Sequence, residues 1–254
     1  MPSEPGYGQF CPIAVATEVL AQRWTPLVIR ELLLGSSRFS ELQRGVPRMS
    51  PALLSRRLRE LELAGLIESR RSRAVHGRAV EYRLTAAGRE LYPVVESMGL
   101  WAQRWLRHKL FAQRNLDPDL LMWDIRRRAI LRSPAREGER YVAEFQLSVT
   151  PAVQRCYWLV FERGHGDLCY KDPGFEVDLY VSVPLRVLAQ VWLGHLSIDQ
   201  AIGDGQLRLH GTRGEIRAFR SWFALSVFAP AGPASGTTTG SVVEPAAERP
   251  PPAP

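Results

Sequence analysis

The side chains best suited to recognising a polyanion are arginines, and they gather in two short stretches of the first half. Three of them, Arg56, Arg57 and Arg59, lie within the segment from Ser50 to Ala64. Arginine holds several N–H donors in one plane, and these match the two acceptors of guanine as well as phosphate oxygens. The second stretch contains four: Arg70, Arg71, Arg73 and Arg78.

The segment from Ser50 to Ala64 has the pattern of a helix with one apolar face. Ser50 followed by Pro51 is a helix start, and Gly65 is a typical residue just after a helix end. At about 100° per residue, Leu54, Leu58 and Leu61 fall in one narrow sector that would face a core. The opposite face carries Ala52, Ser55, Arg56 and Arg59.

A helix that enters the major groove of DNA needs small residues near its N-terminus and arginine facing the bases. Arg57 lies toward the flank, where we expect a phosphate contact, and the helix N-terminus itself favours a phosphate. Taken alone, an arginine-rich solvated helix would explain the same pattern. The residues expected to contact DNA from this helix are Ser50, Pro51, Ala52, Ser55, Arg56, Arg57 and Arg59.

The neighbouring elements favour the DNA-binding interpretation. Short helices are expected over residues 12–22, 25–35 (capped by Thr25) and 40–45. Two strands follow at 66–70 and 80–84, and the loop 71–79 between them is basic and contains a glycine. This order predicts a winged helix-turn-helix, in which Arg70, Arg71, Arg73 and Arg78 would hold phosphates or enter a minor groove. His76 is expected to be an exposed loop residue.

A last long helix is predicted from Thr85 to about Leu110, with a kink at Pro93. Its apolar stripe is too large for a small winged head to cover, so a partner helix in a homodimer is the expected cover. The alternative is that the second half of the same chain covers it. The expected dimerisation residues are Leu91, Val95, Met98, Trp101 and Trp105.

The charge distribution agrees with a polyanion partner for the first half. Of the net charge of +7, residues 1–116 contribute 18 basic against 10 acidic side chains, and residues 117–230 contribute 14 against 14. The 45% hydrophobic and 23% charged composition excludes wholesale disorder, and no apolar run reaches the roughly 18 residues of a membrane span. Three cysteines are too few for a disulfide framework in a chain of this size, and residues 1–10 lack the basic region of a secretory signal. We therefore expect a cytoplasmic protein.

Residues 11–108 resemble the HxlR-type transcriptional regulators, which are related to the MarR type. The resemblance lies in CPIAVATEVLAQRWTPLVIRELLLG (11–35), RFSELQRGVPRMSPALLSRRLRELELAGLIESR (38–70) and VEYRLTAAGREL (80–91). It implies a homodimer that binds a pseudo-palindromic operator in double-stranded DNA with one recognition helix in each half-site. Some members use a cysteine near the start as an oxidant sensor. Cys11 is therefore a possible redox sensor, since it precedes a helix whose N-terminus would stabilise a thiolate.

The second half is predicted to be an α+β domain. Alternating residues indicate half-buried antiparallel strands at 141–149 and 175–183, with a hairpin from Cys156 to Lys171 that turns at 164–167. Cys156 and Cys169 are expected to be buried. Helices are expected at 184–193, 197–202 and 215–228, with a strand at 207–209. Arg126, Arg127 and Arg128 are expected on a solvated helix face.

The segment VLAQVWLGHLSIDQAIGDGQLRLHG (187–211) resembles the sterol-carrier-protein type, which implies a pocket for a hydrophobic small molecule. A packed domain that only supports dimerisation is the alternative. The expected organisation is an arm (1–10), a winged helix-turn-helix domain (11–110), a linker (111–118), a sterol-carrier-like α+β domain (119–230) and a disordered tail (231–254).

The sequence contains no other functional motif: it has no phosphate-binding loop and no metal-binding or catalytic motif. We therefore expect neither a cofactor nor an enzyme, and no membrane partner. The rival function is a lipid carrier whose basic half docks on anionic membranes. DNA is favoured, because no helix combines a basic face with exposed large apolar residues outside the predicted dimer seam.

Overall fold

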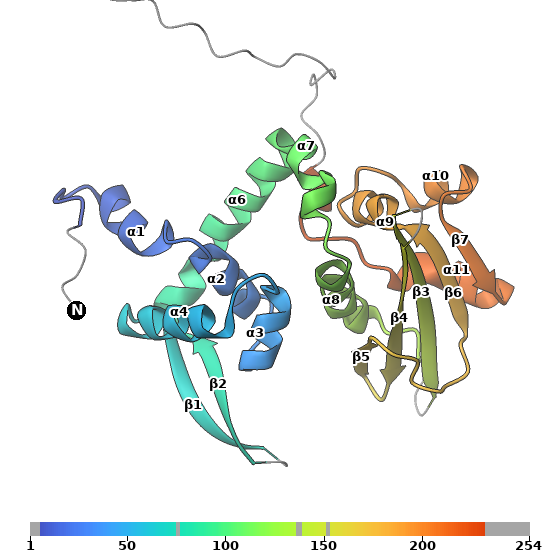
Figure 1. The fold of residues 1–254 in the computed structure, drawn as a ribbon, viewed down its shortest axis with the longest axis horizontal. Coiled ribbons are helices and arrows are strands. Elements are labelled where there is room, and N and C mark those ends of the chain that lie inside the picture. Colours follow the sequence, from blue (N-terminus) through green and yellow to red (C-terminus); the bar gives the residue numbers. More distant parts are fainter. Residues whose placement is uncertain (1–5, 75–76, 136–138, 151–152, 232–254) are drawn as a thin grey trace, which may run out of the picture.

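The structure is a computed structural model that describes residues 6–74, 77–135, 139–150 and 153–231. It is built of two halves that lie side by side, with one long helix rising between them (Figure 1). The fold is mixed α+β, with a winged helix-turn-helix as its first half. No helix in the described ranges is long and apolar enough to cross a membrane.

The first half consists of helices around a single leucine-rich core, followed by a hairpin. Its core contains Val28, Ile29, Leu42, Leu54 and Leu58. The elements are α1 (Pro12–Leu20), α2 (Thr25–Leu33), α3 (Phe39–Gly45), α4 (Pro51–Leu63), β1 (Ile67–Ala74), β2 (Gly77–Leu84), α5 (Ala86–Glu90), α6 (Tyr92–Trp105) and α7 (Arg107–Leu110).

Three expectations for this half need correction. Trp24, with a left-handed φ of 78°, occupies the cap position of α2, and Thr25 is already helical and buried. The hairpin strands are longer than the apolar alternation indicates, because pairing continues to Ala74 and Gly77 after the ribbon has left the core. The long helix is broken into α5, α6 and α7. Pro93 lacks an N–H and starts α6 instead of bending one helix, and Leu106, with a non-helical φ of −113°, separates α6 from α7.

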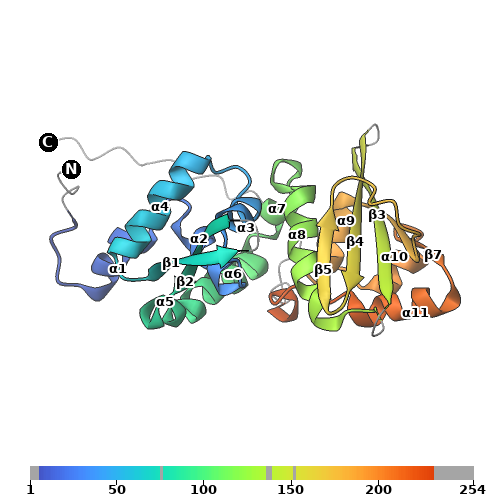
Figure 2. The same cartoon turned by 90° about the horizontal axis from the view of Figure 1, so that it is seen from below.

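The second half is a five-stranded sheet flanked by helices. The strand order is β5-β4-β3-β6-β7, and Figure 2 shows α8 beside β5, between the sheet and the first half. The elements are α8 (Pro118–Ala129), β3 (Arg140–Thr150), β4 (Val153–Glu162), β5 (His165–Cys169), β6 (Leu179–Pro184), α9 (Leu185–Trp192), α10 (Ile198–Gly203), β7 (Arg208–Gly211) and α11 (Arg213–Trp222). Short 3-10 turns lie at Gln113–Asn115, Ile130–Arg132 and Ala229–Ala231.

The sheet departs from the expected antiparallel arrangement at one place. β6 pairs with β3 in parallel, because the chain leaves β5 and returns along the other side of β3. Alternation of apolar residues does not distinguish the two directions of pairing. β6 also begins at Leu179 rather than near residue 175, and the β4–β5 turn lies at Arg163 and Gly164, both with positive φ.

Two further expectations for this half are wrong, and a third lies outside the described residues. α11 ends at Trp222, six residues before the predicted end at residue 228, and an irregular segment follows it. Cys156 is exposed because it lies in the exposed first four residues of β4, and Cys169 is half-buried at the end of the edge strand β5. The predicted tail falls almost entirely outside the described residues, as do residues 1–5 of the arm.

Candidate nucleic-acid interface

Helix α4 is held in place by its cap and by one packed face. The hydroxyl of Ser50 accepts a hydrogen bond from the backbone N–H of Leu53 at 3.3 Å, and Pro51 lies in the first turn. Leu54, Leu58 and Leu61 are buried in the core of the first half, as their spacing predicts. Gly65, with a φ of 69°, allows the chain to turn away immediately after the helix.

The opposite face of α4 is open to solvent. Ala52, Arg56 and Arg59 are exposed, and Ser55 is half-buried. The side chain of Arg56 is 63% exposed and has only a loose ion pair with Glu60, at 3.7 Å. Most of the arginine donors on this face are therefore available to an external acceptor, and the second half of the chain does not cover them (Figure 1).

Arg57 lies differently from the flank position expected for it. It is buried at 8% exposure, and its Nη1 donates to Glu60 Oε2 at 2.6 Å. Its position in the helical repeat is next to Leu54 and Leu61, so the side chain turns into a crevice between α4, α1 and α2. In this conformation Arg57 is directed away from the exposed face of α4.

The hairpin β1–β2 extends away from the body of the first half, next to α4 (Figure 1). Arg70 and Arg71 are exposed on β1, and Arg70 Nη2 lies 2.9 Å from Glu68 Oε1. Arg73 and Arg78 pair with each other in the backbone register, but their side chains lie outside the described residues, as does His76. Arg83 on β2 is exposed as well; we did not predict it because it lies inside the apolar strand pattern.

The apolar stripe of α6 divides into two parts. Leu91 and Val95 are half-buried against the core of the first half. Met98, Trp101 and Trp105 remain more than half exposed, so the second half does not cover them as the alternative interpretation required. The second half contacts α6 elsewhere.

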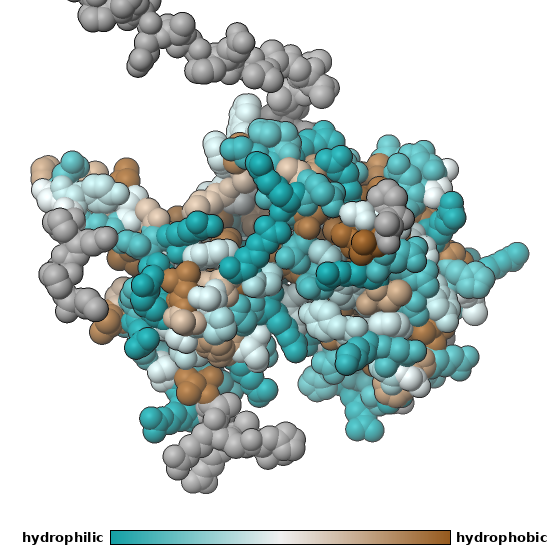
Figure 3. Space-filling model, in the orientation of Figure 1, coloured by the Kyte–Doolittle hydropathy of each residue, from teal (hydrophilic) through white to brown (hydrophobic). Residues whose placement is uncertain are grey.

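Among the α6 contacts to the second half, Gln103 Nε2 donates to the carbonyl of Leu193 at 2.5 Å. Figure 3, drawn in the orientation of Figure 1, shows hydrophilic side chains over most of this face of both halves. The second half thus reaches α6 through this buried polar contact and through Phe228, which packs against Gly99, and it leaves the exposed tryptophans free.

Cys11 lies at the N-terminal cap of α1 and is partly exposed. Helix α1 has no buried residue, so the thiol lies on a thinly packed part of the first half. All three cysteines of the chain are free thiols.

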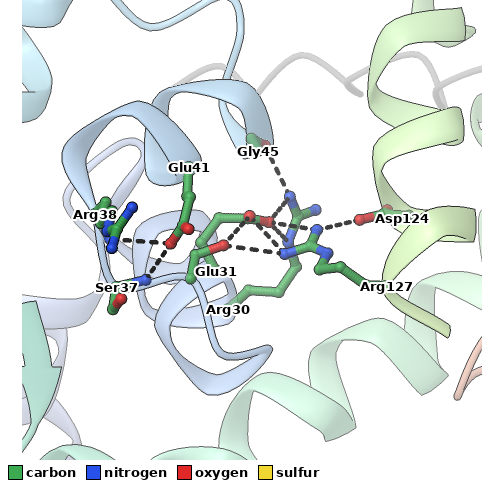
Figure 4. A network of polar contacts seen from close by, with 9 residues as sticks. Arg30, Glu31, Ser37, Arg38, Glu41, Gly45, Asp124 and Arg127 are labelled. Atoms are coloured by element: carbon green, nitrogen blue, oxygen red, sulfur yellow. Dashed lines mark hydrogen bonds and ion pairs between the residues drawn. The ribbon is translucent and has the colours of Figure 1, made fainter. Parts of the chain in front are cut away.

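The two halves are joined by a buried ion network that we did not predict (Figure 4). Arg127 of α8 was expected on a solvated face, but its Nη1 donates to Glu31 Oε2 of α2 at 2.7 Å and its Nη2 donates to Asp124. Arg30 donates to Glu31 Oε1 at 2.7 Å and to the carbonyl of Gly45 at 2.9 Å. Burial would lower the pKa of Arg127, but the carboxylates of Asp124 and Glu31 outweigh burial and raise that pKa.

A family model for the HxlR-like helix-turn-helix matches residues 19–110. The uncharacterised HTH-type transcriptional regulator YvaP of Bacillus subtilis is 37% identical over 99 residues, which cover 39% of this chain and 91% of YvaP. An uncharacterised HTH-type transcriptional regulator of Methanothermobacter thermautotrophicus is 35% identical over 99 residues, 39% of this chain and 75% of that protein.

Among solved structures, the reduced form of the transcriptional regulator YodB from B. subtilis matches at 32% identity, with a TM-score of 0.35 over 39% of this chain and 98% of YodB. All of these matches span little more than a third of the chain, and the family model stops at residue 110, before α8 and the five-stranded sheet. The chain belongs to the HxlR-like helix-turn-helix family of transcriptional regulators.

Proposed function

We propose that this protein regulates transcription as a homodimer that binds a pseudo-palindromic operator through α4. One observation carries the proposal: α4 is a capped helix with a leucine face packed in the core and an arginine face open to solvent. A helix of this kind can lie in the major groove without rearrangement of the fold that holds it.

The exposed residues of α4 divide into two roles. Arg56 and Arg59 read base edges, since arginine matches the acceptors of guanine, and Ala52 and Ser55 allow close approach. Ser50 and Pro51 bring the N-terminus of α4 to a phosphate, where the helix dipole favours negative charge. Arg57 is left out of this set because it is buried against Glu60.

The hairpin supplies contacts that position the protein on DNA. Arg70 and Arg71 are exposed on β1, and Arg73 and Arg78 occupy the end of the ribbon by sequence and register. Contacts of this type strengthen binding to all sequences and make the affinity depend on salt.

The homodimer is supported by the exposed part of the α6 stripe. Met98, Trp101 and Trp105 present large apolar surfaces at about one-turn spacing on a helix end that projects beyond the head (Figure 1). Tryptophans of this kind are typical of the centre of protein interfaces. A second copy of α6, antiparallel or crossed, would bury these side chains together with those of its own stripe.

We propose that residues 119–230 form a sterol-carrier-like domain, joined to the winged helix-turn-helix domain of residues 11–110 by the linker 111–118. The sheet with α9, α10 and α11 around an aromatic core supports this division. α8 already packs on that core, so the domain begins within α8. A domain of this type would modulate DNA binding through an apolar small molecule.

The test is selection of bound sequences from a random pool of double-stranded DNA, using the full chain. We expect enrichment of an inverted repeat and a gel-shift affinity for it that is at least about a thousandfold above that for scrambled DNA. Equal affinity for both sequences would contradict the proposal. Flotation with anionic liposomes, with and without that DNA, tests the rival lipid-carrier function, for which we expect no binding.

A further inference from the structure

An apolar cavity lies at the boundary between the two halves. Its volume is about 320 Å³, which is within the range of small-molecule sites. Its walls come from α2 and α6 of the DNA-binding half and from α8, α9 and residues 226–228 of the second half. The apolar side chains that line it include Leu33, Leu34, Leu121, Ala189, Leu193 and Val227.

Most charged groups at the cavity already have partners. Arg30 and Arg127 pair with Glu31, and Arg127 also pairs with Asp124, so this network is neutral as a whole (Figure 4). Two more carboxylates reach the cavity. Glu96 accepts a hydrogen bond from the hydroxyl of Tyr92 at 2.8 Å.

The second of these carboxylates, Asp117, caps α8 by accepting hydrogen bonds from two backbone N–H groups of its first turn. Both carboxylates therefore have neutral hydrogen-bond donors, and among the described residues neither has a cationic partner within 4.0 Å.

Arg128 differs from the other two arginines on this wall, Arg30 and Arg127, because no described carboxylate pairs with it. Its Nε donates to the carbonyl of Leu225 at 3.2 Å, which fixes the side chain beside the segment 226–228. Among the described residues no carboxylate lies within 4.0 Å of its guanidinium, so the two terminal nitrogens keep their donors. An arginine with unused donors at the edge of an apolar cavity suits a carboxylate or another small anion.

We propose that this cavity binds a small, largely apolar molecule with one anionic group, and that the anion pairs with Arg128. This site rests on the proposed modulation of DNA binding by a ligand. It places the ligand at the boundary between the two halves, not in the core of the second half. The core itself is filled by buried aromatic rings, including Phe145, Phe219, Trp222 and Phe223.

The position of the cavity also gives the ligand a route to DNA binding. α2 forms one wall, and its Arg30, which lines the cavity, donates to the carbonyl of Gly45 at the end of α3, just before the turn into α4. A ligand that changes the spacing of α2 and α8 therefore acts on the elements that carry α4.

The first experiment uses the full-length protein and the fluorescent apolar anion 1-anilinonaphthalene-8-sulfonate. We expect saturable binding with one site per chain, displaced by decanoate and not by decylamine. Arg128→Gln should weaken decanoate binding by about tenfold, the effect of losing one charged hydrogen-bonded pair. Arg132→Gln, an exposed arginine one turn further on that does not line the cavity, is the matched control and should leave binding unchanged.

The second experiment fills the cavity from opposite walls. Val227→Trp and Leu34→Trp replace partly exposed residues, and each should abolish the saturable binding. Leu27→Trp places the same side chain at an equally exposed position of α2 that does not line the cavity, and it should bind like the wild type. Melting curves of each variant verify folding, and the Arg128 variant tests the site independently of the filled ones.

Absence of saturable binding, equal displacement by decylamine, or unchanged binding in both filled variants would overturn the inference. None of these measurements contains DNA. A protein that binds the selected operator but not the probe contradicts the ligand site alone, and one that binds the probe but no DNA contradicts the proposed function alone.

Discussion

Arg127 of α8 donates to Glu31 of α2 at 2.7 Å, and the side chain of Glu31 is fully buried. The two residues are 96 positions apart, and their contact ties the second half to α2, which shares the core of the first half with α4. Because Arg30 also pairs with Glu31, the buried carboxylate has two cationic partners, one from each half of the chain.

Breaking this link should destabilise the fold. Arg127→Gln leaves Glu31 and Asp124 with one cation fewer in a buried site, so we expect the free energy of unfolding to fall by about 3 kcal/mol. Urea denaturation measures the change. Arg140→Gln, which removes a half-exposed pair with Glu162, is the control and should change it by less than about 1 kcal/mol. Equal losses in the two variants would show that the link contributes no more than a surface pair.

His195 makes stability depend on pH. Burial, with a smaller contribution from Arg107, lowers its pKa below the ordinary 6.5, and the ring packs edge-on against Phe111 at 5.1 Å between centroids. The unfolded chain therefore binds a proton that the folded chain resists. The stability that neutral His195 contributes is fully present above about pH 6.5 and is lost as the pH falls toward the folded-state pKa of this histidine.

His195→Phe should remove this part of the acid destabilisation, and thermal melts across that pH range measure it. The exposed His108→Phe serves as the control and should keep the wild-type profile. A wild-type profile in the His195 variant would mean that the histidine does not titrate differently in the folded chain.

Trp101 should be central to the dimer. Trp101→Glu places a charge on the exposed stripe of α6, and we expect it to weaken dimerisation by more than about thirtyfold. Sedimentation equilibrium measures the association. Leu131→Glu alters an even more exposed apolar residue away from α6 and should leave the dimer intact. A monomeric wild-type protein, or a dimeric Trp101 variant, would exclude this interface.

Cys11 should carry any response to thiol oxidants. It is partly exposed and lies at the N-terminal cap of α1, where an oxidant can reach it. After diamide treatment we expect the operator affinity of the wild type to fall, and that of Cys11→Ser to stay constant. Cys156→Ser removes a more exposed thiol far from α4 and should respond like the wild type. The same fall in both variants would assign the response elsewhere.

Patterns local in sequence predicted the fold well. The spacing of Leu54, Leu58 and Leu61 and the Ser50–Pro51 start determine α4, because burial and capping act within a few turns. Gly194 and Ser197 delimit the helices of the second half in the same way.

Features that depend on distant partners were missed. The parallel pairing of β6 with β3 and the Glu31–Arg127 contact leave no local periodicity, since each is decided by where remote segments pack. Arg57 was misplaced for a related reason, because its angle on the helix is close to the border of the apolar face and the packing of α1 and α2 decides its side.

The most direct test of the account measures operator affinity after changes on the exposed face of α4. Arg56→Ala and Arg59→Ala should each weaken binding to the selected operator by about 1–3 kcal/mol, roughly five- to 150-fold, while binding to scrambled DNA changes little. Arg213→Ala, an exposed arginine at the start of α11, should bind like the wild type. If both α4 variants keep wild-type affinity and sequence preference, α4 does not read DNA and the central claim fails.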